Sequence, residues 1–290
     1  MESRAVAFRG HGGLVLVGDA VGRSADPPAL LLHGGGQTRH AWGTTARSLA
    51  AAGWYVVSLD HRGHGDSGWP PDGDYLLSSF AGDVAAVARE LGAPPVVVGA
   101  SLGGLAALMA EGELGPILAA LVLVDVAPRM APDGVARIVS FMKSGLDGFD
   151  SLEAAADAVA SYLPHRRRPA DLGGLAKNLR RHDDGKWRWH WDPRFVRRDR
   201  GDPSFNRERL LAAAGRLELP VLIVRGKMSN VLSAEGVREI RALVPHALYV
   251  DVAGASHMVA GDDNDAFSSA VIDFLAELSS NQIARSRPAQ

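Results

Sequence analysis

The segment Gly99–Gly103 carries the pattern Gly-x-Ser-x-Gly, with Ser101 at its centre. An apolar run, 96–98, leads into this pattern, and a helix-like run, 105–109, follows it. Strand, sharp turn and helix in this order are typical of a nucleophile elbow, where flanking glycines give room to a serine in a strained turn. Such a hydroxyl attacks a carbonyl carbon when a base lies within hydrogen-bond reach. We therefore predict that Ser101 is a nucleophile, against the alternative that it only fits a tight turn.

His257 is the candidate for the base. It lies in a short loop of small residues after the strand-like run 247–252, where its side chain can face the strand ends. A neutral imidazole takes up a serine proton near pH 7. The alternative is a histidine whose hydrogen bonds serve only its own loop.

Two residues compete to orient His257. Asp125 ends the apolar run 119–124, and Asn230 lies in the polar segment after the run 221–224. An aspartate would also stabilise the imidazolium, whereas an asparagine oxygen fixes the tautomer without supplying charge. Asp125 could instead have only a structural role at the start of the segment that follows it. The sequence leaves both candidates open.

A glycine-rich turn, His33–Gly36, follows the apolar run 29–32. The backbone N–H of Gly35, with Gly36 as the second choice, could bind an oxyanion together with the N–H of Leu102, the residue after the nucleophile. A plain turn is the alternative. The chain lacks the Gly-Lys-Ser/Thr and Gly-x-Gly-x-x-Gly patterns at this turn, which argues against a phosphate-binding loop.

The elements that must position these residues alternate along the chain. Apolar strand-like runs followed by helix-like segments favour an α/β fold with a parallel sheet covered on both faces. The expected strands are 6–8, 14–18, 29–32, 55–59, 96–98, 119–124, 221–224 and 247–252. The expected helices between and after them are 44–52, 78–91, 234–243 and 265–278, and the polar tail 281–290 is expected to fray.

The alternation stops between residues 127 and 217. This stretch shows no strand-like run, and we expect a mostly helical insertion with helices at 135–143, 151–162 and 172–181. It holds 15 Arg and 3 Lys against 12 Asp and Glu, a net charge of +6, with the densest clusters at 166–168 and 197–198. Attraction of an anionic substrate is one interpretation, and a solvated arginine-rich surface is the other.

Three tryptophans alternate within this insertion, at positions 187, 189 and 191. Alternating residues of an extended segment share one side. Trp189 and Trp191, with Gly36, are candidates to line a substrate pocket, although they could equally pin the insertion to the core.

Composition limits the classes of function. A chain of 290 residues can bury one large core with an inserted subdomain, and a net charge of −2 gives no general attraction to nucleic acid. The chain has no cysteine, which excludes disulfides and thiolate metal sites, and no cluster has convincing metal-ligand spacing. The beginning of the chain shows no secretory signal pattern and the apolar runs are short, so we expect a cytoplasmic protein that does not bind membranes. The oligomeric state does not follow from the sequence.

Taken in order, these motifs resemble the α/β-hydrolase family with a helical cap inserted after the sixth strand. The matching segments share a place at strand ends and are His33–Gly36, 60–67, Gly99–Gly103, Leu123–Asp125 and Gly254–His257. The resemblance implies a core at 1–126 and 218–280 with a cap at 127–217. It is closest to the group of esterases, cofactor-free haloperoxidases and epoxide-hydrolase-like proteins. Epoxide hydrolases and haloalkane dehalogenases of this group carry aspartate at the elbow, so Ser101 argues against both.

The resemblance also implies a reaction. It predicts hydrolysis of an ester-like small molecule (a carboxylic ester, thioester or lactone) through an acyl-Ser101 intermediate, with His257 last in chain order and no cofactor. The family usually has aspartate where this chain has Asn230. That departure keeps two other classes open: a ligand-binding or weakly active hydrolase-like protein, and a lyase or acyl transferase of the same fold.

Overall fold

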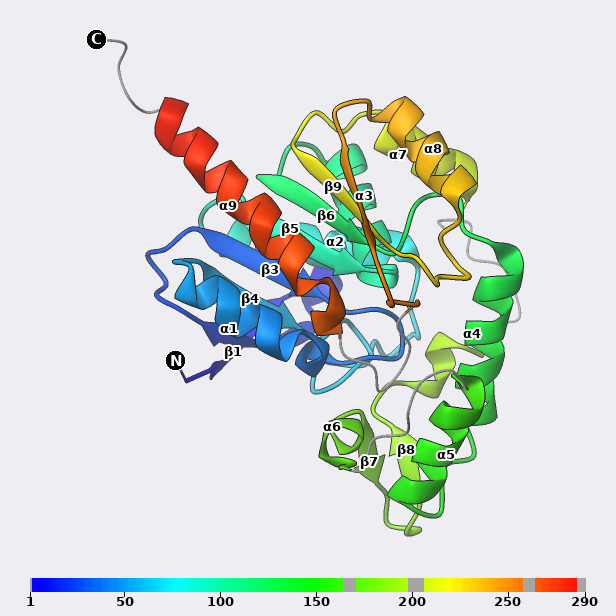
Figure 1. Cartoon of the computed structure of the whole chain (residues 1–290). Helices are drawn as coiled ribbons and strands as arrows, with labels where there is room; N and C mark the ends of the chain where they lie inside the picture. Colours follow the sequence, from blue (N-terminus) through cyan, green and yellow to red (C-terminus); the bar gives the residue numbers. More distant parts are fainter. Residues whose placement is uncertain (1, 164–170, 198–205, 258–263, 286–290) are drawn as a thin grey trace.

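The computed structural model describes residues 2–163, 171–197, 206–257 and 264–285. Its centre is an eight-stranded sheet with the strand order β1-β2-β4-β3-β5-β6-β9-β10 (Figure 1). The strands are β1 (Arg4–Arg9), β2 (Val15–Val21), β3 (Pro28–Leu32), β4 (Tyr55–Leu59), β5 (Val96–Ala100), β6 (Ala120–Val124), β9 (Val221–Gly226) and β10 (Leu248–Val252). β2 pairs antiparallel with β1 and β4, and all other pairs are parallel, so the predicted mostly parallel sheet is confirmed.

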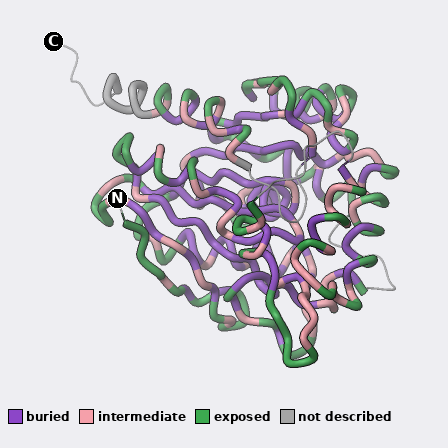
Figure 2. Tube along the Cα trace, turned by 60° about the horizontal axis from the view of Figure 1, so that its bottom comes forward, coloured by how far each residue is buried: buried purple, intermediate pink, exposed green. Residues whose placement is uncertain are grey.

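Each central strand is buried on both faces, which explains its unbroken apolar sequence. Along β3, Ala29 and Leu31 belong to one apolar cluster, and Leu30 and Leu32 belong to the other. Helices α2 (Leu77–Glu90), α3 (Leu102–Leu114), α7 (Arg207–Ala214) and α8 (Ala234–Leu243) contribute side chains to the second cluster. Helices α1 (Gly43–Ala51) and α9 (Ser268–Arg285) cover the first (Figure 1). Figure 2 shows buried backbone through the middle of the sheet and exposure on the outer sides of the helices.

A separate small unit lies between β6 and β9, beyond one end of the sheet (Figure 1). Its described elements are α4 (Pro132–Ser144), α5 (Leu152–Tyr162), α6 (Gly173–Ala176), β7 (Leu179–Arg181), β8 (Trp187–Trp189) and a 3-10 helix at Pro193–Phe195. It has an apolar cluster of its own, in which Phe141, Trp189 and Trp191 are buried. We call this unit the cap.

The expectation of a cap without strands, and of a helix over 172–181, is wrong. β7 and β8 form an antiparallel hairpin that pairs Leu179 with Trp189. The turn closes through a hydrogen bond from the N–H of Gly185, which has a left-handed φ of 81°, to the carbonyl of His182. An Asp-Gly turn followed by alternating tryptophans is a hairpin signal, and it overrides the helix-like spacing before it.

Two boundaries, the end of the cap and the end of the last helix, differ from those expected from the sequence. Helix α7, assigned to the cap by sequence, packs against α3, and its residues Leu210 and Ala213 belong to the core cluster of the sheet. We propose that the cap ends before α7. At the other end, α9 continues to Arg285, so the first part of the tail expected to fray is helical, and 286–290 lie outside the described residues. Across the described ranges, no helix is both long enough and apolar enough to cross a membrane.

Candidate active site

Ser101 occupies a sharp turn between β5 and α3. Its backbone has φ 47° and ψ −112°, a conformation that side-chain-bearing residues rarely adopt and that marks a strained turn. Packing enforces the flanking glycines: a Cβ on Gly99 would lie 2.5 Å from the backbone nitrogen of Gly104, and one on Gly103 would lie 2.6 Å from Leu32 Cβ. The geometry is therefore that of the expected elbow, with the serine at the start of a helix.

The other candidate residues follow the neighbouring strands. β3, β5, β6, β9 and β10 are consecutive in the sheet and mutually parallel, so their carboxyl ends meet at one edge. The His33–Gly36 turn follows β3, Ser101 follows β5, Asp125 follows β6 and His257 lies in the loop after β10. The fold thus brings together residues as distant in sequence as His33 and His257.

Asp125 is hydrogen-bonded to His257. Nδ1 of His257 lies 2.7 Å from Oδ2 of Asp125, and both side chains are buried. The other carboxylate oxygen, Oδ1, accepts the N–H of Gly226 at 3.1 Å. Since a carboxylate accepts and does not donate, Nδ1 carries a proton, and in the neutral imidazole Nε2 is then the acceptor. This is the tautomer that a general base needs.

Asn230 does not occupy that position. Its side chain is exposed, and its backbone carbonyl oxygen lies against the first cap helix, where a Cβ on Gly134 would lie 2.2 Å from it. The residue that reaches the carboxylate from the loop after β9 is Ser229, whose Oγ lies 2.6 Å from Asp125 Oδ2. The sequence analysis does not single out Ser229, although its hydroxyl directly precedes Asn230 in the same polar loop.

The glycine-rich turn lies against the elbow. A Cβ on Gly34 would lie 3.5 Å from Ser101 Cβ, and one on Gly35 would lie 3.9 Å from Leu102 Cδ2. The N–H of Gly34 donates to Gln37 Oε1 at 2.9 Å, and the N–H of Gly36 donates to His64 Nε2 at 3.1 Å. With its two neighbours engaged in this way, Gly35 is the glycine of the turn best suited to offer its N–H to a substrate.

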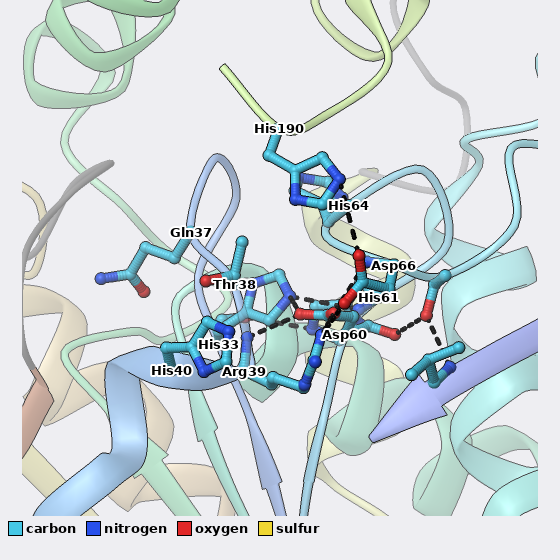
Figure 3. A network of polar contacts seen from close by, with 12 residues as sticks. His33, Gln37, Thr38, Arg39, His40, Asp60, His61, His64, Asp66 and His190 are labelled. Carbon is cyan, nitrogen blue, oxygen red and sulfur yellow. Dashed lines mark hydrogen bonds and ion pairs between the residues drawn. The ribbon is translucent and has the colours of Figure 1, made fainter. Parts of the chain in front are cut away.

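Buried histidines support this turn from behind (Figure 3). Nδ1 of His33 donates to the carbonyl of Gly34 at 2.7 Å, and its Nε2 accepts the N–H of His61 at 3.1 Å. His64 Nδ1 donates to the carbonyl of Arg62 at 3.0 Å. Burial lowers the pKa of His61 to about 3 and that of His64 to about 4, and holds the pKa of His33 well below its ordinary value. All three are therefore neutral at pH 7.

An ion-pair network lies next to these histidines (Figure 3). Asp60 is fully buried, and it accepts hydrogen bonds from the side chain of Arg39 and from the N–H groups of Arg39 and Asp66. Burial raises the pKa of Asp60, while Arg39 acts in the opposite direction. Asp66 also binds Arg180 of the cap at 2.8 Å, so the network connects the turn region to the cap.

A cap segment is fixed against the core close to Gly35. The hydroxyl of Tyr75 donates to Asp192 Oδ2 at 2.6 Å, and Arg194 donates to the same carboxylate. The ring of Phe195 thereby reaches the turn, because a Cβ on Gly35 would lie 3.3 Å from Phe195 Cζ.

The predicted pocket residues lie nearby but in different settings. Trp189 packs against Phe141 and Phe149 inside the cap, with ring centroids 6.0 and 5.4 Å apart. Trp191 is buried at the junction of cap and core, where its backbone bridges to His64 and its ring lies 6.5 Å from that of Phe195. That Trp189, Trp191 and Gly36 contact substrate stays a prediction.

In the described part of the cap, ion pairs neutralise some of the positive charge. Arg188 pairs with Asp184 and Arg194 with Asp192, each at 2.6 Å. The cluster 166–168 and Arg198 lie outside the described residues. Attraction of an anionic substrate stays a prediction. Within the described ranges, no group of three or more His, Cys, Asp or Glu residues is placed to hold a metal ion.

Comparison with known proteins identifies the family of this chain. The family model for the alpha/beta hydrolase fold matches residues 27–263. The chain belongs to the α/β-hydrolase family. An esterase from Mycobacterium tuberculosis is 32% identical to this α/β-hydrolase over 244 residues, which cover 81% of this chain and 78% of that protein. A 3-hydroxybutyrate-oligomer hydrolase from Cupriavidus necator is 28% identical and covers 81% of this chain, with 84% of its own length matched.

Solved structures agree with the fold of this α/β-hydrolase. An α/β hydrolase from Novosphingobium aromaticivorans superposes with a TM-score of 0.78 at 25% identity, covering 95% of this chain and 98% of that one. A structure of the Mycobacterium tuberculosis esterase superposes with a TM-score of 0.73 at 28% identity, covering 95% and 92%. The chain falls in the esterase-like group of its family.

Proposed function

We propose that this α/β-hydrolase cleaves an ester-like bond of a small molecule, namely a carboxylic ester, a thioester or a lactone, through an acyl intermediate on Ser101. The observation that carries the proposal is the hydrogen bond from His257 Nδ1 to Asp125 Oδ2, made at the strand ends beside the elbow. The relatives named as an esterase and as a 3-hydroxybutyrate-oligomer hydrolase support ester chemistry.

In the first half of the reaction, Ser101 Oγ attacks the carbonyl carbon while its proton passes to Nε2 of His257. The carboxylate of Asp125 stabilises the imidazolium that forms. The N–H groups of Gly35 and Leu102 donate hydrogen bonds that stabilise the negative charge on the carbonyl oxygen. When the tetrahedral species collapses, His257 gives its proton to the departing alcohol or thiol.

In the second half, water attacks the acyl carbon of the ester on Ser101, and His257 takes a proton from that water. Collapse of this second tetrahedral species releases the carboxylic acid product and returns the proton to Ser101 Oγ. Each proton therefore moves through Nε2, while Nδ1 stays bonded to Asp125.

The ligand-binding alternative drew its support from the missing aspartate after β9. Asp125 supplies a carboxylate to His257 from the end of β6, and this weakens that alternative. A lyase or acyl transferase of the same fold would use the same three residues. Such an enzyme is distinguished from a hydrolase by its product, because it would not release the free acid.

The test combines turnover with active-site labelling. The wild type should hydrolyse a p-nitrophenyl ester to the free acid, and a fluorophosphonate should label it once, at Ser101. Ser101→Ala and His257→Ala should abolish both signals, while Ser24→Ala, in an exposed loop, should change neither. Folded wild-type protein that neither reacts with the probe nor releases acid would contradict the proposal.

A further inference from the structure

Ser229 contacts the candidate triad, yet no step of the proposed mechanism uses it. Its Oγ lies 2.6 Å from Asp125 Oδ2, the same oxygen that lies 2.7 Å from His257 Nδ1. The carboxylate oxygen is therefore held between a hydroxyl from the loop after β9 and the imidazole from the loop after β10.

The direction of the Ser229 hydrogen bond follows from its other contacts. Oγ accepts the N–H of Val231 and the N–H of Leu232, both at 3.1 Å. Because these two donors occupy the acceptor sites of the hydroxyl, its own hydrogen must point to Asp125. Oδ2 thus receives two hydrogens while Oδ1 receives the N–H of Gly226.

The loop that carries Ser229 is fastened to the loop that carries His257. The N–H of Met228 donates to the carbonyl of Ala255 at 2.9 Å. A Cβ on Gly226 would lie 2.6 Å from the same carbonyl oxygen, so the two loops are in direct backbone contact. A displacement of Ser229 would therefore disturb the positions of both Asp125 and His257.

We propose that Ser229 is a positioning residue, which fixes the rotation of the Asp125 carboxylate so that Oδ2 faces His257 Nδ1. The loop after β9 then serves the triad through a hydroxyl, while the carboxylate comes from β6. This inference rests on the proposed function, since it assigns a role within the same triad. Hydrogen bonds from neutral donors to a carboxylate are stronger than those between neutral groups, so one such bond can select a rotamer.

The test compares variants that differ in the hydroxyl alone. Ser229→Thr and Ser229→Val have side chains of the same shape, and only the first can donate to Asp125. We expect Val to lower kcat for a p-nitrophenyl ester by about ten- to a hundredfold with KM nearly unchanged, and Thr to retain most of the activity. This loss stays below the roughly 10⁴-fold cost of replacing a triad aspartate by asparagine.

Ser233→Ala is the matched control. Ser233 lies in the same loop, where its Oγ accepts the N–H of Gly236 at 3.1 Å and caps α8. This variant should lower the melting temperature slightly and leave kcat unchanged. Equal kcat values for Ser229→Thr and Ser229→Val, in folded proteins, would overturn the inference.

A spectroscopic measurement separates this inference from the proposed function. The Nδ1–H of His257 should give a downfield proton resonance in the wild type, shifted or broadened in Ser229→Val and retained in Ser229→Thr and Ser233→Ala. If the wild type cleaves no ester but shows this pattern, the proposed function fails and the positioning role stands. An unchanged resonance in Ser229→Val contradicts the positioning role whatever the turnover.

Discussion

The backbone N–H of Gly36 donates to Nε2 of His64 across 3.1 Å and thereby ties the turn after β3 to the loop after β4. His64 can accept this bond only in its neutral form, because its Nδ1–H already donates to the carbonyl of Arg62. The shape of the turn beside Gly35 therefore depends on a buried, uncharged histidine. Its neighbours His33 and His61 are held in the same state by burial.

His64→Leu should loosen this turn and lower kcat by about tenfold, less than the roughly 10²–10³-fold cost of removing an oxyanion donor outright. His64→Gln should retain most of the activity, because its amide oxygen can accept the N–H of Gly36 in place of Nε2. Steady-state kinetics on a p-nitrophenyl ester distinguishes the two. Equal losses in both variants would show that the acceptor on Gly36 does not matter.

Asp125→Asn should lower kcat by roughly 10⁴-fold, because an amide at this position can stabilise the wrong tautomer of His257 and supplies no charge to the imidazolium. Asn230→Ala should change kcat less than about twofold, since this side chain is exposed. The control is the melting temperature of each variant. A large effect at Asn230 with a small one at Asp125 would reverse the assignment of the orienting residue.

The protein should lose stability as the pH falls below about 6.5. In the unfolded chain the three buried histidines take up protons near pH 6.5, whereas in the folded chain the pKa of His61 is about 3 and that of His64 about 4. The unfolded state therefore binds more protons between these values, and His61 and His64 should each cost about 2 kcal/mol of unfolding free energy by about pH 5, with a cost of the same sign from His33. Urea unfolding at several pH values measures this slope. His64→Gln should reduce it, and a flat profile would mean that the histidines are solvated.

Phe195→Ala should enlarge the space beside Gly35. The ring lies within van der Waals reach of this glycine, so we expect kcat/KM for esters of bulky acids to rise by about tenfold relative to acetate esters. Trp189→Ala should lower the unfolding free energy by about 3–5 kcal/mol, because this side chain packs within the cap. A change of substrate range in Trp189→Ala would place its ring in the pocket.

Gly99→Ala should abolish activity, because the new Cβ would lie 2.5 Å from the backbone nitrogen of Gly104 and would push the elbow apart. Gly174→Ala, in cap helix α6, is the matched control, since no atom apart from its chain neighbours and its own helix backbone lies within 4 Å of the position of its Cβ. Fluorophosphonate labelling checks the elbow directly. Labelling of Gly99→Ala at the wild-type rate would contradict the steric argument.

The strands and the elbow were predictable because their signals are local. The run Val96–Val98 is buried on both faces, and the two glycines of Gly99–Gly103 that follow it are typical of a tight turn. The pattern therefore has one interpretation. The hairpin at 179–189 was missed, since its Asp-Gly turn is short and follows a helix-like stretch.

The partners of His257 depended on contacts between loops that are distant in sequence. Asn230 and Ser229 are adjacent, and only the path of the loop decides which one faces Asp125. Asn230 instead offers its backbone to the first cap helix. Periodicity and composition carry no information about such a choice, because it is set by the packing of α4 on the loop after β9.

Asp125 is also the residue at which the chain leaves β6 for the cap, and its φ of 52° turns the backbone there. None of the three residues proposed for the catalytic triad lies inside the cap, since Ser101 and Asp125 precede it and His257 follows it. All three therefore come from the core, and we expect the cap to contribute substrate contacts rather than triad members. A foreign cap joined after Val126 and before Asn206 would alter which molecules enter, and it would keep the triad geometry only if it also packed on the loop after β9 as α4 does.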